Sequence, residues 1–580
     1  MTKFTRLSLL MLLLVLVVLP GFAQDDVQPG EGGILIQANT LGDPNFLNPL
    51  LQNSTPELAV NQFMFPSLYA LDPQTLLPTP GAVNDGGLGL ATDWTISEDG
   101  LVYTFTLRDD VVWSDGTPVT AFDYKFTFDA LASGLVASPR TDVLETIASV
   151  EAPDATTVVV TLSFPSCRAL DEMDDFGILP EQAVRAIIGD DFSLINEMDF
   201  NKAPTATSGV FNFATLVPDT QVSMVANPLH VSPVLPTGFI FKSVPDKTIA
   251  LEQFISGDVN VIAQFDVSPE NYGELRELQA AGEIQLYEYI DDGYWWLALN
   301  HADPTNPQDG VDAEGNPIDQ GGHPLFGDVR VRQAMAMALN IDEIITGALN
   351  GDGVPVQAHA STSAWAYNPD IDPYPYDPEA ALAMLAEAGF VDDDNDPSTP
   401  LVATEDALFA EPGTPFSFTI NMQSGDVAVD AATTIMQDQF GRIGIDVSLE
   451  AIEFGALVGV LLGQEFDAIF LNWTNLPTDT DARAQFNPGF DRVGSGFNFI
   501  SYNNPEMTQL FEDALLVPGC DIEERKAIYA QIQQMQHDDL PYLFIYAPKT
   551  VIAVSSDITE FNPFPEALFH NVSRWTALGG

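Results

Sequence analysis

The histidines of this sequence form none of the patterns that metal sites require. The chain has six of them: His230, His301, His323, His359, His537 and His570. None has a partner four residues away, as the paired ligands of a zinc-binding helix do, and HExxH is absent. The nucleophile elbow GxSxG, the GxGxxG turn and a phosphate-binding loop with lysine are absent too. We therefore expect no enzyme: no catalytic residues, no metal and no cofactor.

One acidic run invites a test for calcium binding. Residues 392–396 read DDDND, and counting from Asp394 as the first position of a calcium loop places Glu405 at the twelfth. The sixth position, which needs glycine for a sharp turn, is Thr399, and a proline follows it. We interpret the run as a solvated acidic loop, with a bound cation as the open alternative.

Aromatic residues next to polar ones stand at two places. Tyr294, Trp295 and Trp296 precede the run LALN, and Trp473 and Asn475 follow the apolar run 466–471. Apolar walls with a few polar groups are typical of clefts that bind organic ligands. The alternative is that these aromatic side chains belong to an ordinary core, which is the more frequent role of any single tryptophan.

The composition excludes several classes of protein. The chain has 580 residues, a formal net charge of −63, 46% hydrophobic residues and 10% aromatic residues. This is too apolar for a disordered acidic protein. The negative charge repels phosphate backbones and anionic lipid heads, so we expect no nucleic-acid or membrane-surface partner. The length predicts several domains, and the acidity favours solubility, with a salty environment as a second explanation.

The first residues predict export. Lys3 and Arg6 precede the apolar run 7–19, and Gly21 and Ala23 supply small residues before a cut at Gln24. This pattern is typical of a cleaved signal peptide, and the run is shorter than the roughly 20 residues that span a bilayer. No cysteine lies near the cut, so a lipid anchor through Cys is not expected. The sequence predicts a periplasmic or extracellular protein.

Two cysteines, Cys167 and Cys520, are the only ones in the chain. An exported chain meets oxidising conditions, and an even number favours a disulfide. Two free thiols are the alternative, because a bridge between two parts that move relative to each other would oppose that motion.

Strands and helices alternate irregularly along the chain. Period-2 patterns predict strands at 33–38, 157–162 and 466–471 and a hairpin of 94–96 with 101–108. Helical spacing predicts one helix over 328–349, a second over 378–389 that ends at Gly389, and a third over 521–539 capped by Asp521. Segments 302–323 and 391–415 are expected to be polar surface loops.

One segment resembles a known family. Residues 94–123 read WTISEDGLVYTFTLRDDVVWSDGTPVTAFD. This resembles the signature region of the family 5 extracellular solute-binding proteins, the receptors of ABC importers for oligopeptides, dipeptides and related solutes. The matching positions are Trp94, Ser97, Asp99, Gly100, Tyr103, Thr104, Phe105, Leu107, Arg108, Asp115, Gly116, Pro118, Ala121 and Asp123. Segments 328–340, 376–390 and 443–447 continue the resemblance in order.

The resemblance implies an α/β fold, namely the two-lobed periplasmic-binding-protein type II fold with an extra subdomain in the first lobe. Two strands would form a hinge between the lobes. The expected division is a signal peptide at 1–23, a first lobe at 24–285 with a peripheral subdomain at about 57–190, a second lobe at 286–540, and a return to the first lobe at 541–580.

The resemblance also implies the function. We expect a monomeric, non-enzymatic receptor that captures a small solute, with an oligopeptide or dipeptide as the first choice, and delivers it to an ABC permease in the membrane. The signature region is expected to be structural. The ligand contacts implied by the family are Asn53, Thr55, Tyr294, Trp295, Trp296, Trp473 and Asn475.

One departure from the family pattern concerns the ligand. Peptide-binding members carry an aspartate soon after the second-lobe tryptophan, where it pairs with the α-amine of the peptide. The residue three positions after Trp473 is Leu476, so this anchor is missing or displaced to Asp479 or Asp481. A sugar or an opine is therefore an alternative ligand, and a secreted hydrolase that uses Asp479 and Asp481 is an alternative function. The few histidines argue against a His-ligated nickel complex.

Overall fold

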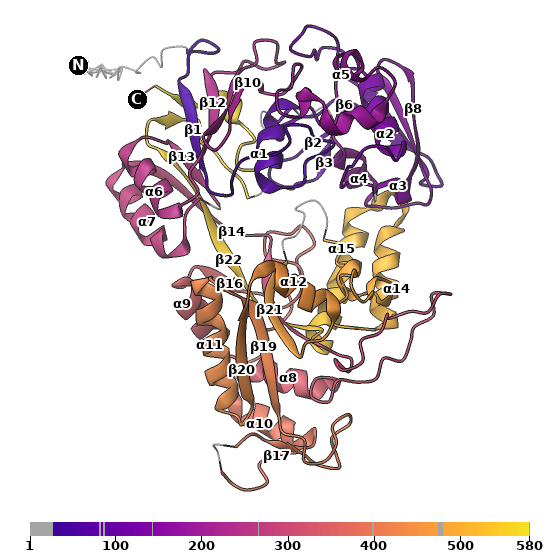
Figure 1. Ribbon diagram of the computed structural model, residues 1–580, viewed down its shortest axis with the longest axis vertical. Helices are drawn as coiled ribbons and strands as arrows, with labels where there is room; N and C mark the ends of the chain where they lie inside the picture. The colour runs from indigo at the N-terminus through magenta and orange to yellow at the C-terminus, as the bar shows by residue number, and fades with distance from the viewer. Residues whose placement is uncertain are drawn as a thin grey trace, which may run out of the picture.

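The computed structural model describes residues 27–578, apart from 81–82, 85–86, 142, 265, 397–398, 474–479 and 566, and only the backbone of 83–84 and 87–88. Figure 1 shows two lobes joined by long strands. Both ends of the described chain lie on the first lobe, where the amide of Ala577 donates to the carbonyl of Gly32. The middle of the chain forms the second lobe.

A mixed sheet of 12 strands runs through both lobes. Its order is β10-β11-β12-β1-β13-β22-β15-β21-β19-β20, and β14 and β16 pair with β22 outside this path. The strands are β1 (Ile34–Asn39), β10 (Phe211–Val217), β11 (Gln221–Ala226), β12 (Gly238–Ser243), β13 (Val261–Ala263), β14 (Ile284–Ile290), β15 (Tyr294–Leu299), β16 (Gly353–Pro355), β19 (Ser417–Gln423), β20 (Asp446–Ile452), β21 (Ala468–Trp473) and β22 (Tyr542–Ser555).

Two segments cross between the lobes side by side. β22 pairs with β13 and β14 through its C-terminal half and with β15 and β16 through its N-terminal half. β14 continues into β15 through residues 291–293. Ile290 lies opposite Lys549, and Trp295 lies opposite Tyr546, so the two crossings are neighbours. They form the connection about which the lobes can rotate.

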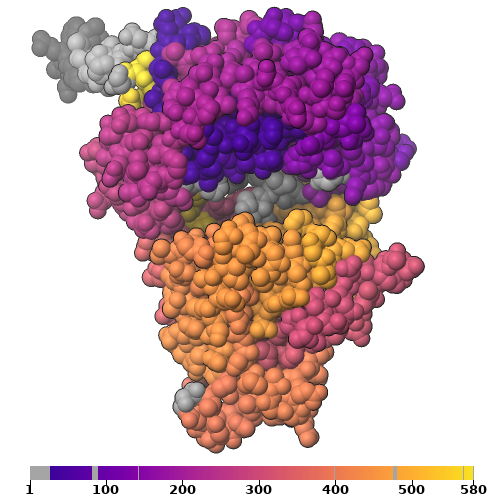
Figure 2. All heavy atoms as spheres, in the orientation of Figure 1, coloured from indigo at the N-terminus to yellow at the C-terminus, as the bar shows by residue number. Residues whose placement is uncertain are grey.

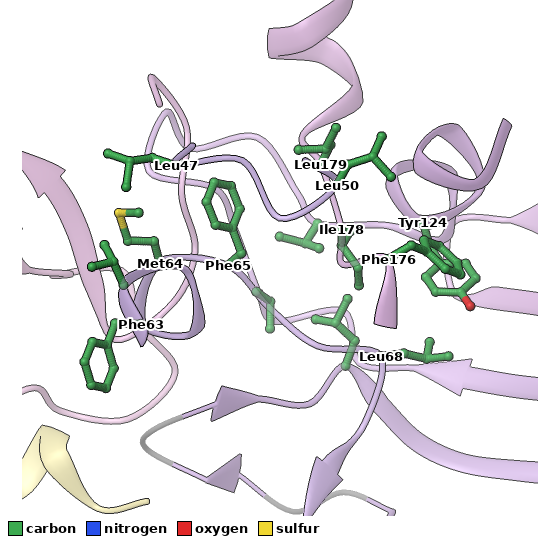
Figure 3. Packing of buried hydrophobic residues seen from close by; sticks show 14 of the residues in the cluster. Leu47, Leu50, Phe63, Met64, Phe65, Leu68, Tyr124, Phe176, Ile178 and Leu179 are labelled. Carbon is green, nitrogen blue, oxygen red and sulfur yellow. The ribbon is translucent and has the colours of Figure 1, made fainter. Parts of the chain in front are cut away.

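The first lobe adds a four-stranded antiparallel sheet to the main sheet. Its order is β6-β7-β9-β8, and its strands are β6 (Ala91–Ile96), β7 (Val102–Leu107), β9 (Thr157–Leu162) and β8 (Ile147–Asp154). Tyr103, Phe105 and Leu107 on β7 are buried, which confirms the alternation seen in the sequence. Figure 3 shows part of the buried core of this lobe, in which Phe65 follows α1 (Thr55–Met64) and Phe176 lies next to Tyr124.

Helices cover both faces of the second-lobe sheet, in which β19 is parallel to β20 and β21. One face packs against the helices α8 (Val329–Ala338), α9 (Ile341–Leu349), α10 (Pro378–Glu387) and α11 (Val427–Gly441). The other face packs against α12 (Phe454–Gly463), α14 (Pro505–Leu515) and α15 (Ile522–Asp539). Among the described helices, none has both the length and the hydropathy of a bilayer-spanning segment.

Most local elements match the sequence predictions. The strands at 33–38, 157–162 and 466–471 and the hairpin correspond to β1, β9, β21 and the pair β6–β7. The C-terminal end of α10 places Gly389 at φ +93°, as a helix-ending glycine requires. The side chain of Asp521 accepts hydrogen bonds from the amides of Glu523 and Glu524, which confirms the predicted cap of α15.

The single helix predicted over 328–349 is wrong, because this segment forms the two helices α8 and α9. The backbone of Leu339 and Asn340 is extended, and the Asn340 side chain accepts a hydrogen bond from the amide of Glu343. Asparagine is a good N-cap, so it starts the second helix where the apolar spacing alone continues without a break.

Candidate ligand-binding cleft

A cleft separates the lobes. Figure 2 shows it between the indigo surface of α1 and its neighbours and the orange and yellow surface of the second lobe. A pocket of about 430 Å³ lies in the first-lobe wall. Its lining comes from the end of β1, α1, residues 67–76, the turn after β13 and residues 567–570, with Asp174 and Tyr289. A pocket of this size is typical of small-molecule sites.

A buried glutamate holds the edge of this pocket. Glu57 on α1 is 0% exposed, and its carboxylate accepts from the amides of Asn45, Phe46 and Asn53 at 2.6–3.0 Å. The amide of Asn53 is thereby tied to the start of α1, where Thr55 lines the pocket. Both predicted contacts, Asn53 and Thr55, have exposed side chains.

Two buried or half-buried aspartates line the same pocket. Asp266 is 4% exposed and accepts from the amides of Thr40 and Ala263, both at 3.1 Å. Burial raises its pKa to about 6. Asp174 accepts from the amide of Leu68 at 2.5 Å, and burial is again the main reason why its pKa rises to about 7. Among the residues that the structure describes, the lining contains His570 but no lysine or arginine.

The aromatic residues predicted at the ligand lie where β15 and β21 leave the hinge. Tyr294 pairs with Trp473 across these strands, and the ring centroids of Trp296 and Trp473 are 5.9 Å apart. Trp296 is 0% exposed and stacks on Tyr542 at 4.8 Å. Tyr294 is also buried, whereas Trp473 is half-buried. Because Trp296 lies in the core, its predicted ligand contact stays a prediction that requires a rearrangement around Tyr542.

The opposite face of β15 carries Trp295. It is half-buried, and its ring lies 5.2 Å from that of Phe470 and 6.0 Å from that of Tyr546. The predicted residues Asn475, Leu476 and Asp479 lie outside the described residues, so the expected displacement of the amine anchor is not tested there.

A disulfide crosses the cleft at the edge away from the hinge. Cys167 in the first lobe is bonded to Cys520 in the second, and the amide of Cys167 donates to the carbonyl of Leu515 at 2.9 Å. Beside it, Arg168 lies 3.7 Å from the buried carboxylate of Asp481. Of the two alternatives left by the sequence, the disulfide is therefore the one found, and it does join the two lobes.

No metal centre is found in the described part of the chain, where no three His, Cys, Asp or Glu side chains gather as metal ligands. The acidic loop uses its carboxylates to form turns. Asp392 accepts from the amides of Asp394 and Asn395, and Asp394 accepts from the hydroxyl of Thr399. These hydrogen bonds fix the turns of the loop.

The signature segment is structural in this fold. Thr120 and Asp123 form a capping box at the start of α2 (Ala121–Ala132). The second carboxylate oxygen of Asp123 accepts from the amide of Glu181, which begins α5 (Glu181–Ile188). None of the signature residues lines the first-lobe pocket.

Of the polar residues in the pocket lining, sequence reasoning named only Thr55 as a ligand contact and missed the others, among them Gln37, Asp174 and Asp266. These three come from separate segments and belong to no motif. In the sequence, each of them stands next to an apolar segment, but so do many other polar residues of this chain.

Comparisons with known proteins agree with this geometry. Residues 87–489 match the family described as bacterial extracellular solute-binding proteins, family 5, middle part. The oligopeptide-binding protein AppA of Bacillus subtilis is 25% identical over 556 residues, which cover 94% of this chain and 92% of AppA. A solved structure of AppA in complex with a nonapeptide has a TM-score of 0.70 at 24% identity and covers 95% of this chain and 99% of its own.

Two further solved structures share the fold. The ABC transporter substrate-binding protein CtaP of Listeria monocytogenes has a TM-score of 0.75 at 22% identity, covering 94% and 99% of the two chains. AgaA of A. tumefaciens R10, in complex with agropinic acid, has a TM-score of 0.64 at 20% identity, covering 93% and 97%. The chain belongs to the bacterial extracellular solute-binding proteins of family 5 and has their type II periplasmic-binding-protein fold.

Proposed function

We propose that this protein is the extracytoplasmic receptor of an ABC importer and that it captures a peptide between its lobes. The observation that carries the proposal is the 430 Å³ pocket in the wall of a cleft whose lobes are joined by two crossing strands on one side and by the disulfide of Cys167 and Cys520 on the other. Rotation about these strands would close the second lobe over a ligand in the pocket. A ligand favours closure only through contacts that the open form lacks.

A peptide is the ligand class that the similarities support best. AppA carries the name oligopeptide-binding protein, and its match to this chain extends over almost the whole length of both. AgaA binds the opine derivative agropinic acid, but at 20% identity it supports the fold alone. A sugar or an opine is therefore kept as an outcome of the test and not as a second proposal.

The surroundings of Asp481 argue against the alternative that this protein is a hydrolase. The Asp481 side chain is 1% exposed and lies 3.1 Å from the guanidinium of Arg483, in addition to its contact with Arg168. A buried carboxylate that is paired with two arginines is not presented to a substrate as a general base must be. Solute binding without turnover is therefore the function proposed here.

The route of the protein in the cell completes the proposal. Residues 1–23 would be removed as a signal peptide and release a monomer into the periplasm or the extracellular space. There the closed, loaded form would meet the permease, and the predicted contacts Asn53, Thr55, Tyr294, Trp295, Trp296, Trp473 and Asn475 would surround the solute together with the pocket.

Native mass spectrometry of the full mature chain tests the ligand class. The protein would be purified without denaturation and its bound small molecules identified, followed by titration calorimetry with peptide pools of two to nine residues. A co-purified peptide, or saturable binding of a pool without cleavage, is expected. A co-purified sugar or opine with no peptide binding would overturn the peptide assignment, and cleavage of the pool would overturn the receptor assignment.

A further inference from the structure

Gln37, Asp174 and Asp266 bring acceptor oxygens to the first-lobe pocket. Gln37 on β1 is 7% exposed, and its amide nitrogen donates to Asp266 at 3.4 Å. The carbonyl oxygen Oε1 of the same side chain is buried and accepts no hydrogen bond from any described residue. Gln37 and Asp266 both line the pocket, so this buried acceptor lies beside it. A buried acceptor without a donor costs free energy, which a bound donor would recover.

Among the described lining residues, the carboxyl groups are those of Asp174 and Asp266, and His570 is the one basic side chain. Asp266 contacts Gln37, and its hydrogen bonds come from neutral donors: two backbone amides, the Gln37 amide and the Thr40 hydroxyl. Asp174 contributes a second carboxyl from the far end of α4 (Ala169–Asp175). No lysine or arginine stands among the described lining residues, so neither carboxyl is paired with one of these cations within the described pocket. A buried or half-buried carboxylate in this position attracts a cationic donor.

The rest of the wall is apolar and suits a carbon stem. Leu41, Leu58 and Leu76 line the pocket together with the aromatic rings of Tyr69, Phe241 and Tyr289. Leu41 and Leu58 are 46% and 52% exposed, so apolar surface at the pocket remains uncovered. A group with a long aliphatic part and a charged tip would bury its stem on these residues while the tip reaches the acceptors.

We propose that the first-lobe pocket receives a cationic nitrogen group of the ligand, an ammonium or guanidinium, which Gln37, Asp174 and Asp266 hold. This inference rests on the proposed function, because a peptide ligand supplies such a group in two ways. A lysine or arginine side chain carries it on an aliphatic stem, and the free amino terminus carries it without one. The apolar walls favour the side chain.

A set of matched peptides tests the proposal on the full mature protein. Each peptide is an alanine pentamer with one central lysine, norleucine or glutamate, made with a free and with an acetylated amino terminus, and affinity is measured by calorimetry. Lysine is expected to bind at least tenfold more tightly than norleucine, and glutamate more weakly than either. A lysine preference that survives acetylation identifies the side chain, whereas an affinity that depends only on the free amino terminus identifies the α-amine as the group held.

Variants connect the preference to the pocket. Asp266→Asn and Asp174→Asn are expected to bring the ratio of lysine to norleucine affinity down by about tenfold each. The control Asp129→Asn changes a carboxylate of α2 that pairs with Lys125 on the same helix, and it should leave the ratio unchanged. Thermal melting of each variant checks that it is folded.

The outcomes separate this inference from the proposed function. Equal binding of lysine, norleucine and glutamate peptides in both amino-terminal forms would overturn the cationic pocket while leaving the peptide receptor in place. Binding of none of these peptides or of the wider pools would overturn the peptide receptor itself. A lysine preference that persists in both aspartate variants would overturn the assignment to this pocket.

Discussion

Cys167 of the first lobe is disulfide-bonded to Cys520 of the second lobe, with their Cα atoms 5.4 Å apart and 353 residues between them in sequence. The bond lies at the edge of the cleft opposite the crossing strands β14–β15 and β22, as Figure 1 shows by the position of α4 above α14. The lobes are therefore joined at both ends of the cleft. The lobes can therefore rotate about the hinge only as far as the disulfide allows Cys167 and Cys520 to move apart.

Breaking the disulfide should let the lobes separate further. In the double variant Cys167→Ser and Cys520→Ser, the contacts left at this edge include the pair of Arg168 and Asp481 at 3.7 Å, which is not a covalent link between the lobes. We expect a larger radius of gyration by small-angle X-ray scattering without ligand, and a loss of roughly 2–4 kcal/mol of stability. Mass spectrometry should find no alkylatable thiol in the oxidised wild type. An unchanged radius of gyration would show that the bond does not limit opening.

The ion pairs at the hinge give a second prediction. Asp352, between α9 and β16, has a side chain 6% exposed and pairs with Arg276 of the first lobe at 2.5 Å and with Lys549 of β22 at 3.5 Å. Asp352→Asn removes the negative charge that pairs with both cations. We therefore expect the free energy of unfolding, measured in urea, to fall by roughly 1–3 kcal/mol.

The control for this hinge variant is Asp110→Asn. Asp110 pairs with Arg108 at 2.6 Å but is 57% exposed, and a surface pair of this kind contributes about 1 kcal/mol or less. If both variants lost the same free energy of unfolding, Asp352 would contribute no more to stability than a surface ion pair does.

Burial of Asp266 predicts a dependence of stability on pH. Its pKa is raised to about 6 in the folded protein from 3.8, so between about pH 4 and 6 the unfolded chain gives up this proton before the folded chain does. The carboxyl therefore lowers stability progressively as pH rises through this window, and the loss is complete above it. Asp266→Asn removes the loss, so the melting temperature of the variant minus that of the wild type should increase between pH 4 and 7. A difference that is flat or falls over this range would contradict the burial of the charge.

Local structure was predictable where a side chain acts on its own neighbours. The Asp521 cap and the turn after Gly389 depend on residues within a few positions, and both were found. The break at Asn340 was not predicted, because the apolar spacing of α8 continues into α9 and hides the cap between them.

The pocket could not be predicted in the same way, because its polar residues meet only through the fold. Gln37 and Asp266 are 229 residues apart in sequence and touch because β1 and β13 are neighbours in the sheet. The sequence singled out the aromatic residues 294–296, but Trp296 is covered by Tyr542 from β22. The family resemblance pointed to these residues as ligand contacts, whereas the fold decides which of them are exposed.

Glu57 supports the last prediction, because three backbone amides of the pocket edge depend on one buried carboxylate. Hydrogen bonds to a charged acceptor contribute about 1.5–3 kcal/mol each, and Glu57→Ala leaves the amides of Asn45, Phe46 and Asn53 without it. We expect the free energy of unfolding to fall by at least roughly 3 kcal/mol. We also expect weaker peptide binding, because Asn53 and Thr55 are no longer held in place. Glu98→Ala, at an exposed turn of the same lobe, is the control and should change neither quantity. If Glu57→Ala lowers stability but binds peptides as the wild type does, the edge formed by Asn53 and Thr55 takes no part in binding.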